Sequence, residues 1–270
     1  MRTGFLITAA CAAFFAGAAA AATSGQDVAP DAPLPLPPVP PRIASGPEYE
    51  HCLAMISTNT EEAVRFAGAW EATGGGDGAA HCLALAHLAQ GEAGVAAEGL
   101  EKLAETSKAE GVARAALYAQ ATQAWLLAGE PLKAYGSATL ALVISPDDID
   151  LLVDRSVASA SGGEYFTAID DLNRVIDLDP SRVDALVFRA AAWRLVDRLE
   201  LAADDIARAV ALDPDNPEAL LERGILRQRR GDLAGARADW THLLAVEPDG
   251  ATADYARQNL ALLEAGPERR

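Results

Sequence analysis

The chain has 270 residues, half of them hydrophobic, and a formal net charge of -17 at pH 7. This length allows one or two domains with a buried core. Nucleic acids and anionic membrane surfaces require a basic footprint, so the acidic balance excludes them as main partners. The abundance of alanine and leucine favours helices over strands.

Residues 1–22 have the pattern of a secretory signal peptide. Arg2 supplies the positive charge, residues 5–20 form the apolar run, and residues 20–22 are three alanines that suit cleavage. In the alternative interpretation, this run is an uncleaved anchor that tethers the protein to the membrane. Because alanine is a weak driver of insertion, we expect cleavage, a periplasmic protein and no stable membrane insertion afterwards.

Residues 23–47 are expected to be a flexible, proline-rich linker. Eight prolines fall between Pro30 and Pro47, and such a segment favours an extended polyproline II conformation. Its PxxP spacings, such as Pro35 to Pro38, also suit a recognition ligand. We expect a spacer.

Four prolines recur at an interval of 34 residues, at Pro146, Pro180, Pro214 and Pro248. Proline ends a helix because it lacks the amide donor and clashes with the preceding turn. Small residues share the interval, as expected where two helices cross closely: Ala134, Ala168, Ala202 and Ala236. Polar residues just after the prolines can cap the next helices: Asp147, Ser181, Asn216 and Asp249. A fixed period of this length predicts a stacked solenoid of helix pairs.

The period divides the chain into units. Residues 48–114 read as a degenerate helical N-terminal region, with helices expected at 48–57, 60–73 and 78–90. The expected repeats and the final capping helix span residues 115–148, 149–182, 183–216, 217–250 and 251–265.

Three segments carry a family resemblance. They are AIDDLNRVIDLDP (168–180), AADDIARAVALDP (202–214) and the run 219–248, which contains Gly224, Gly231 and Ala236. These segments resemble tetratricopeptide repeats, clearly over 149–250 and weakly before residue 115. The resemblance implies an all-α fold, a right-handed α-solenoid of stacked helix-turn-helix repeats. It also implies a protein that binds a protein or peptide and is not an enzyme.

In this family the first helices of successive repeats line the concave surface. Carried over to this chain, the resemblance implies a partner groove formed by Gln123, Val153, Val157, Val187, Arg194, Leu221, Ile225 and Gln228. An apolar floor edged by acids suits a hydrophobic helix or an extended segment with basic flanks. The alternative is that these side chains pack against the neighbouring helix. The lysines and asparagines with which chaperone-binding relatives hold a terminal carboxylate are absent, which argues against that class of partner.

Two cysteines, Cys52 and Cys82, each lie in the tetrapeptide His-Cys-Leu-Ala. An even number of cysteines in an exported chain favours a disulfide. If the helices run up, down and up, these two positions meet on parallel neighbours. Unpaired thiols, and a metal or redox site built from both His-Cys pairs, are the alternatives. The metal site is disfavoured because adjacent helical residues point about 100° apart and no CxxC is present.

Catalytic motifs are missing from the sequence: there is no GxSxG, HExxH, Walker loop or GxGxxG. We therefore expect no catalytic residues, no cofactor and no metal. The dipeptides Asp170-Asp171 and Asp204-Asp205 read as one solvated surface motif copied twice. Three arginines near one helix face are interpreted either as an anion or carboxylate contact or as a solvated face with ion pairs: Arg223, Arg227 and Arg230.

The sequence thus predicts a non-enzymatic periplasmic scaffold that binds another protein of the bacterial cell envelope. One alternative is a redox- or metal-linked envelope assembly factor that uses Cys52 and Cys82. Another is the regulatory subunit of an enzyme.

Overall fold

The computed structural model describes residues 43–265, so the expected signal peptide and most of the expected linker lie outside the described residues. Within this range the chain forms thirteen helices and no strand. The helices are α1 (Pro47–Ile56), α2 (Thr60–Ala72), α3 (Gly76–Ala89), α4 (Ala93–Thr106), α5 (Gly111–Leu127), α6 (Pro131–Ile144), α7 (Ile149–Ser161), α8 (Tyr165–Leu178), α9 (Val183–Leu195), α10 (Leu199–Leu212), α11 (Pro217–Arg229), α12 (Leu233–Val246) and α13 (Ala251–Ala265). None of them is long and apolar enough to cross a membrane.

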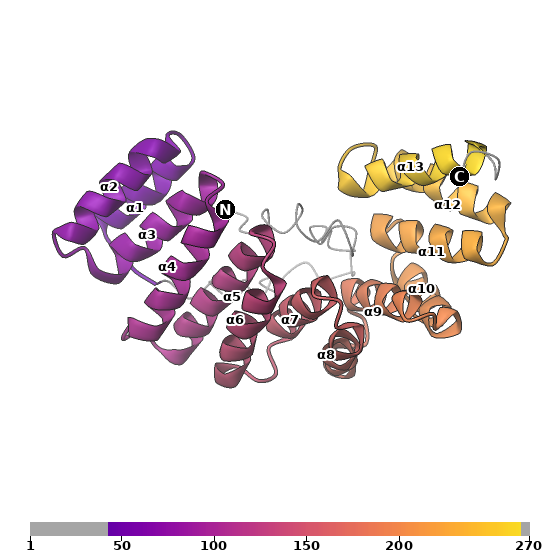
Figure 1. The fold of residues 1–270 in the computed structure, drawn as a ribbon, viewed down its shortest axis with the longest axis horizontal. Helices are drawn as coiled ribbons and strands as arrows, with labels where there is room; N and C mark the ends of the chain where they lie inside the picture. The colour runs from indigo at the N-terminus through magenta and orange to yellow at the C-terminus, as the bar shows by residue number, and fades with distance from the viewer. Residues whose placement is uncertain (1–42, 266–270) are drawn as a thin grey trace, which may run out of the picture.

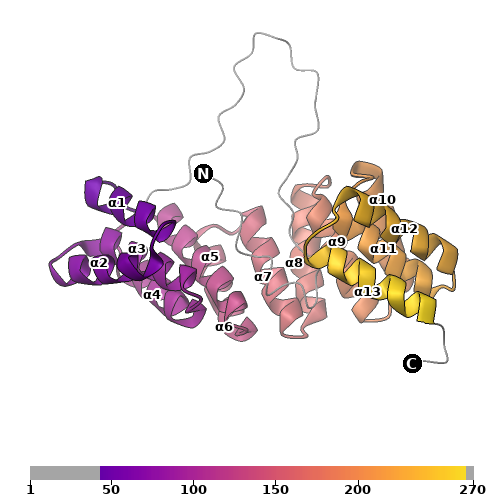
Figure 2. The same ribbon diagram turned by 90° about the horizontal axis from the view of Figure 1, so that it is seen from above.

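The helices follow one another along an arc (Figure 1). Viewed from above, the chain runs from α1 and α2 at one end to a group formed by α10 to α13 at the other (Figure 2). Each helix packs on the next, and the odd-numbered helices from α5 to α13 also contact one another in sequence. Figure 1 shows α7 and α9 toward the inside of the arc and α8 toward the outside. The prediction of an all-α solenoid is confirmed, and its inner side is built by odd-numbered helices.

The helix starts follow from local chemistry. The side chain of Asp148 accepts hydrogen bonds from the first turn of α7, and Asn216 does the same for α11. Pro217 occupies the first turn of α11, where its missing N–H costs nothing. Asp147 and Ser181 were expected to cap α7 and α9. The N-cap residues of these two helices are instead Asp148 and Arg182.

The turn between the two helices of a repeat requires a left-handed backbone. Gly129, Gly163 and Gly231 have φ of 73°, 85° and 84°. In the third copy the corresponding residue is Asp197, and its φ of 59° preserves the same turn. Aspartate tolerates this conformation better than most residues with a Cβ.

Small residues allow the paired helices to cross closely. The four alanines at the 34-residue interval are all fully buried. Gly224 of α11 lies so near Trp240 of α12 that a Cβ on it would overlap the indole ring. Trp240 is fully buried and donates from Nε1 to the Leu221 carbonyl oxygen at 3.2 Å.

The core is divided into three clusters of buried side chains. The largest runs from α3 to α11, a second joins α11, α12 and α13, and a third joins α1, α2 and α3. The hydrophobic core is therefore not continuous along the solenoid, because each end has a separate cluster. The helix α5 begins at Gly111, four residues before the expected start of the first repeat at residue 115.

Candidate functional site

The N-terminal cluster contains both described cysteines. The sulfur atoms of Cys52 on α1 and Cys82 on α3 lie 1.97 Å apart as a disulfide, with their Cα atoms 6.3 Å apart. Both residues are completely buried. The bond therefore joins two helices that are separated by 30 residues of sequence.

The two histidines beside these cysteines have different surroundings. His51 is exposed and packs edge-on against Phe66, with ring centroids 5.3 Å apart. His81 is buried, with Nδ1 2.6 Å from the Tyr49 hydroxyl and Nε2 2.8 Å from Gln120 Oε1. Burial lowers the pKa of His81, so the neutral ring links α1 to α5 through these hydrogen bonds. Among residues 43–265 no three histidine, cysteine or acidic side chains are placed to hold a metal ion.

The C-terminal repeats contain a recurring buried ion pair between their two helices. Arg155 binds Asp171 through Nη2 at 2.6 Å and Nε at 2.9 Å. The same fork joins Arg189 to Asp205 at 2.6 and 2.8 Å, and Arg223 to Asp239 at 2.7 and 3.1 Å. The three aspartate side chains are only 4–7% exposed. We call these three pairs the Arg–Asp ladder.

The ladder corrects the expectation that Asp170-Asp171 and Asp204-Asp205 are solvated motifs. Only the first aspartate of each pair is exposed, and the second is buried against an arginine of the preceding helix. The signal was present in the sequence, because the arginines at 155, 189 and 223 share the 34-residue interval with aspartates sixteen residues later.

Polar side chains also connect successive odd-numbered helices. Asp154 of α7 interacts with Gln123 of α5, which lowers the pKa of its carboxyl group. Arg182, just before α9, reaches Asp150 of α7 at 2.8 Å. The pairs that join α9 to α11 and α11 to α13 are Arg194–Glu222 and Thr252–Glu218. We call this row of contacts the inner seam.

Two acids of the inner seam are partly neutral near pH 7. Burial raises the pKa of Asp154 to about 7, and the negative charge of Asp150 adds to the effect. Burial likewise raises the pKa of Glu218 to about 7, with Glu247 contributing. A cation that approached either group would favour its ionised form.

Half of the predicted partner groove is buried. Val153, Val157, Val187 and Leu221 are at most 8% exposed, because these side chains belong to the cores between helices. They therefore pack against neighbouring helices and do not form an open apolar floor. The other four expected residues remain partly accessible: Gln123, Arg194, Ile225 and Gln228. The accessible part of the groove is mainly polar.

Two cavities lie at equivalent junctions between repeats. One, of about 250 Å³, is between α6 and α7 and is lined partly by Tyr135, Ser159 and Gly162. The other, of about 190 Å³, is between α10 and α11 and is lined partly by Ala203, Arg227 and Arg230. These two sets of residues differ by 68 positions, or two repeats. The junction between them, α8 with α9, has Trp193 among the side chains packed on the core.

Comparison with known proteins agrees with this architecture. Residues 189–261 match the family model described as tetratricopeptide repeat. MamA from residue 41 onward, from Desulfovibrio magneticus RS-1, is 19% identical, with a TM-score of 0.54 over 63% of this chain and 93% of that chain. A tetratricopeptide repeat protein from Parabacteroides merdae is 18% identical, with a TM-score of 0.56 over 83% of this chain and 76% of that chain.

A third solved structure is YrrB, described as a TPR protein with an unusual peptide-binding site. It is 18% identical and has a TM-score of 0.53 over 64% of this chain and 88% of that chain. Likeness at these identities shows the fold. No curated protein sequence matches the chain.

Proposed function

Because this chain is a solenoid that contains tetratricopeptide repeats, we propose that it is a non-enzymatic scaffold that binds a segment of another protein. The proposal places the segment along the inner seam, where Gln123, Arg194, Ile225 and Gln228 are partly accessible. An extended or helical peptide can run along such a surface and contact several repeats at once.

The observation that carries the proposal is the row of polar contacts between successive odd-numbered helices. Hydrogen-bonding groups of four consecutive helix pairs lie along one side of the solenoid. Three of these helix pairs include an acidic side chain suited to bind a cation. The carboxyl groups of Asp154 and Glu218 have pKa values raised to about 7, and the side chain of Asp150 is exposed. A partner segment that carries lysine or arginine therefore suits this surface best.

We further propose that the protein is exported to the periplasm and binds another envelope protein. Support comes from the signal-peptide pattern of residues 1–22 and from the pairing of Cys52 with Cys82. Disulfides persist in oxidising compartments and are rare in the cytosol.

The alternative, a redox- or metal-linked assembly factor, receives less support. A redox partner must attack one sulfur of the disulfide, yet both cysteines are completely buried. The adjacent histidines do not converge with them, because His51 is exposed and His81 is held between Tyr49 and Gln120. We therefore interpret the pair as structural.

Site-directed photocrosslinking in the native envelope tests the proposed surface. A photoreactive amino acid replaces Gln123 or Gln228 on the inner seam, and Asp170 or Asp204 on outer helices serves as the matched control. We expect discrete crosslinked partners from the inner positions only. Equal adducts from the outer positions would contradict the assigned surface.

Two further measurements test export and the disulfide. The mature N-terminus and the cell fraction show whether residues 1–22 are removed and the chain reaches the periplasm. Thiol titration of the denatured, non-reduced protein should find no free thiol from Cys52 and Cys82. Two titratable thiols in the mature protein would rule the bond out.

A further inference from the structure

The junction between α10 and α11 differs from the junction one repeat earlier. At the α8–α9 junction, Ile169, Leu172 and Ala192 belong to one core cluster, and Trp193 packs against it. Thirty-four residues later, the places of Ile169 and Trp193 are taken by Ala203 and Arg227. Two bulky apolar groups are thus replaced by a small residue and a cation, while Leu172 and Ala192 are replaced by Ile206 and Leu226.

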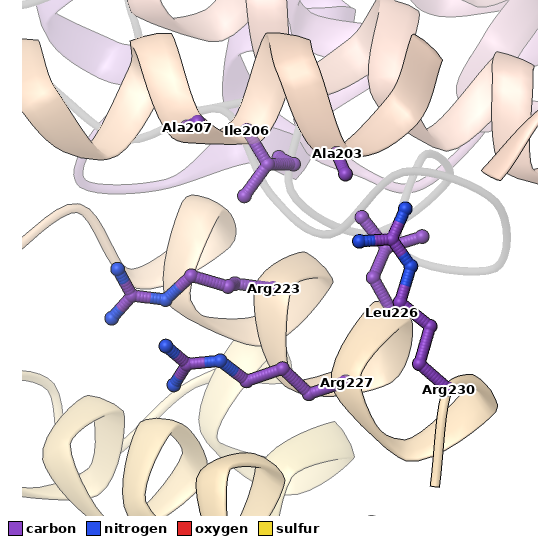
Figure 3. Close-up of a pocket in the computed structure, with 7 residues that line it drawn as sticks. All are labelled: Ala203, Ile206, Ala207, Arg223, Leu226, Arg227 and Arg230. Carbon is purple, nitrogen blue, oxygen red and sulfur yellow. The ribbon is translucent and has the colours of Figure 1, made fainter. Parts of the chain in front are cut away.

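The replacement leaves a cavity of about 190 Å³, shown in Figure 3. Its apolar wall is formed by Ala203, Ile206, Ala207 and Leu226, and its polar wall by Arg223, Arg227 and Arg230. In Figure 3, Arg223 and Arg227 extend side by side from α11, and Arg230 extends toward Ala203 of α10. The cavity has room for one side chain, much less than a typical cofactor site offers.

Positive charge is in excess at this cavity. Arg223 and Arg227 share the single buried carboxylate of Asp239, with shortest distances of 2.7 Å each. Arg227 also lies 3.9 Å from the exposed Asp232. Arg230 is exposed and donates from Nη2 to the carbonyl oxygen of Leu199 at 3.1 Å. Three guanidinium groups therefore contact only two carboxylates, in a chain whose net charge is -17.

We propose that this cavity binds an acidic side chain of a partner protein, with an aliphatic neighbour of that side chain against Ile206 and Leu226. Guanidinium groups bind carboxylates through paired, charge-assisted hydrogen bonds. The apolar wall then excludes water from that contact, which strengthens it. Arg230 supplies the donors, because Asp239 already holds both Arg223 and Arg227.

This inference rests on the proposed protein-binding function but assigns a second surface. The cavity lies between an even-numbered and an odd-numbered helix, whereas the inner seam lies between odd-numbered helices. A partner that carries basic residues along the inner seam and an acidic residue at this junction would contact both surfaces.

The test uses two synthetic probes, the capped tripeptides acetyl-Leu-Glu-Leu-amide and acetyl-Leu-Gln-Leu-amide, and the mature protein. Nuclear magnetic resonance reports the Arg230 side-chain N–H and the Leu226 methyl groups. We expect saturable shifts of both signals with the glutamate peptide, which weaken as salt is raised. The glutamine peptide should bind at least about tenfold more weakly, since it lacks the charge.

Two variants separate the charge from the shape of the cavity. Arg230→Gln removes the arginine that no carboxylate holds, and Ala203→Ile refills the space with the side chain found at residue 169. Each should reduce affinity for the glutamate peptide at least about tenfold, while Arg237→Gln, on exposed α12 surface, should not. Equal binding of the two peptides, or unchanged binding in both variants, would overturn the proposal.

The peptide-binding experiment can fail or succeed independently of the crosslinking experiment on the inner seam. Loss of peptide binding in Ala203→Ile with retained crosslinking at Gln228 would show two independent surfaces. Crosslinking at Gln228 without any glutamate-peptide binding would leave the scaffold function standing and exclude the cavity.

Discussion

The N-terminal helices and the C-terminal repeats hold their helices together by different interactions. At the N-terminal end, a disulfide joins α1 to α3 within a small separate cluster, and His81 links this cluster to Gln120 of α5. In the repeats from α7 to α12, each helix pair is joined by one rung of the Arg–Asp ladder. The disulfide is covalent and occurs once, whereas the Arg–Asp ion pair recurs at the interval of 34 residues.

This difference shows how a solenoid tolerates an irregular end. A repeat that contacts only its neighbours loses stability where the pattern degenerates. The cross-link reduces the conformational entropy of the unfolded N-terminal segment, which offsets the missing repeat contacts. In the regular part, a buried aspartate is tolerated because a bidentate arginine satisfies both of its oxygens.

The largest effect is expected from breaking one rung of the ladder. Asp205→Ala leaves Arg189 partly buried without its carboxylate, so the free energy of unfolding should fall by about 3–5 kcal/mol. Chemical denaturation followed by circular dichroism measures this change. Asp204→Ala, one residue away and exposed, is the matched control and should change stability by less than about 0.5 kcal/mol. Similar effects of the two variants would contradict the assigned burial.

Removal of the disulfide should come next in size and act only at the other end. Cys52→Ser combined with Cys82→Ser releases a 30-residue loop, which corresponds to about 3–4 kcal/mol in the chain-entropy model. Hydrogen exchange should show lost protection in α1 to α3 and unchanged protection in α9 to α12. The reduced wild-type protein should behave like the double variant. Uniform loss along the chain would mean that the two ends fold as one unit.

Close helix crossing in the C-terminal repeats can be tested with glycine. Gly224→Ala places a methyl group against Trp240, and such overpacking costs about 1–3 kcal/mol. Gly136→Ala on α6 is the matched control, because nothing lies within 4 Å of its added methyl group. The control should leave the protein unchanged or stabilise it by up to about 1 kcal/mol. Thermal unfolding of both variants distinguishes the two outcomes.

The smallest expected effect is on pH dependence, which should have opposite signs in the N-terminal helices and in α7. The raised pKa of Asp154, about 7, means that the folded state holds this proton more tightly than the unfolded state. Stability of the α7 region should therefore fall as pH rises from about 4 to 7. His81 has a lowered pKa, so the N-terminal region should lose stability as pH falls below about 6.5.

Hydrogen exchange at pH 5.5 and 7.5, corrected for the intrinsic exchange rate, measures both trends. Asp154→Asn should abolish the fall in α7 and leave α3 unchanged. His81→Gln should do the reverse. The charged groups around Asp154 are Asp148, Asp150 and Arg182, so an unchanged slope in Asp154→Asn would assign the effect to one of them.

Much of the fold follows from the sequence because its signals are local. Proline ends a helix and glycine allows a left-handed turn wherever they occur, so the interval of 34 residues predicts the hairpins directly. The sequence also showed the one exception, Asp197, which replaces the glycine of the other repeats. Its backbone adopts the same left-handed conformation, so the turn is preserved.

The candidate site was harder to predict because it depends on the rotation of each helix. Asp170 and Asp171 are adjacent and chemically identical, yet only Asp171 faces Arg155. The same limitation applies to Val153, Val157 and Val187, which were assigned to the groove by resemblance. Successive odd-numbered helices contact one another and cover these short side chains. Longer polar residues at neighbouring positions, such as Gln123 and Arg194, extend past that contact.

The placement of the two kinds of charged contact has a consequence for how such a chain diversifies by gaining or losing whole repeats. Each rung of the ladder lies within one repeat, so a duplication or deletion of residues 183–216 carries or removes a complete ion pair. The inner-seam contact between Arg194 and Glu222 crosses a repeat boundary. After that deletion, Ala160 would stand in the place of Arg194, and Glu222 would lose its partner. Gain or loss of a repeat would thus keep the ion pairs that support folding while it rearranges the proposed partner surface.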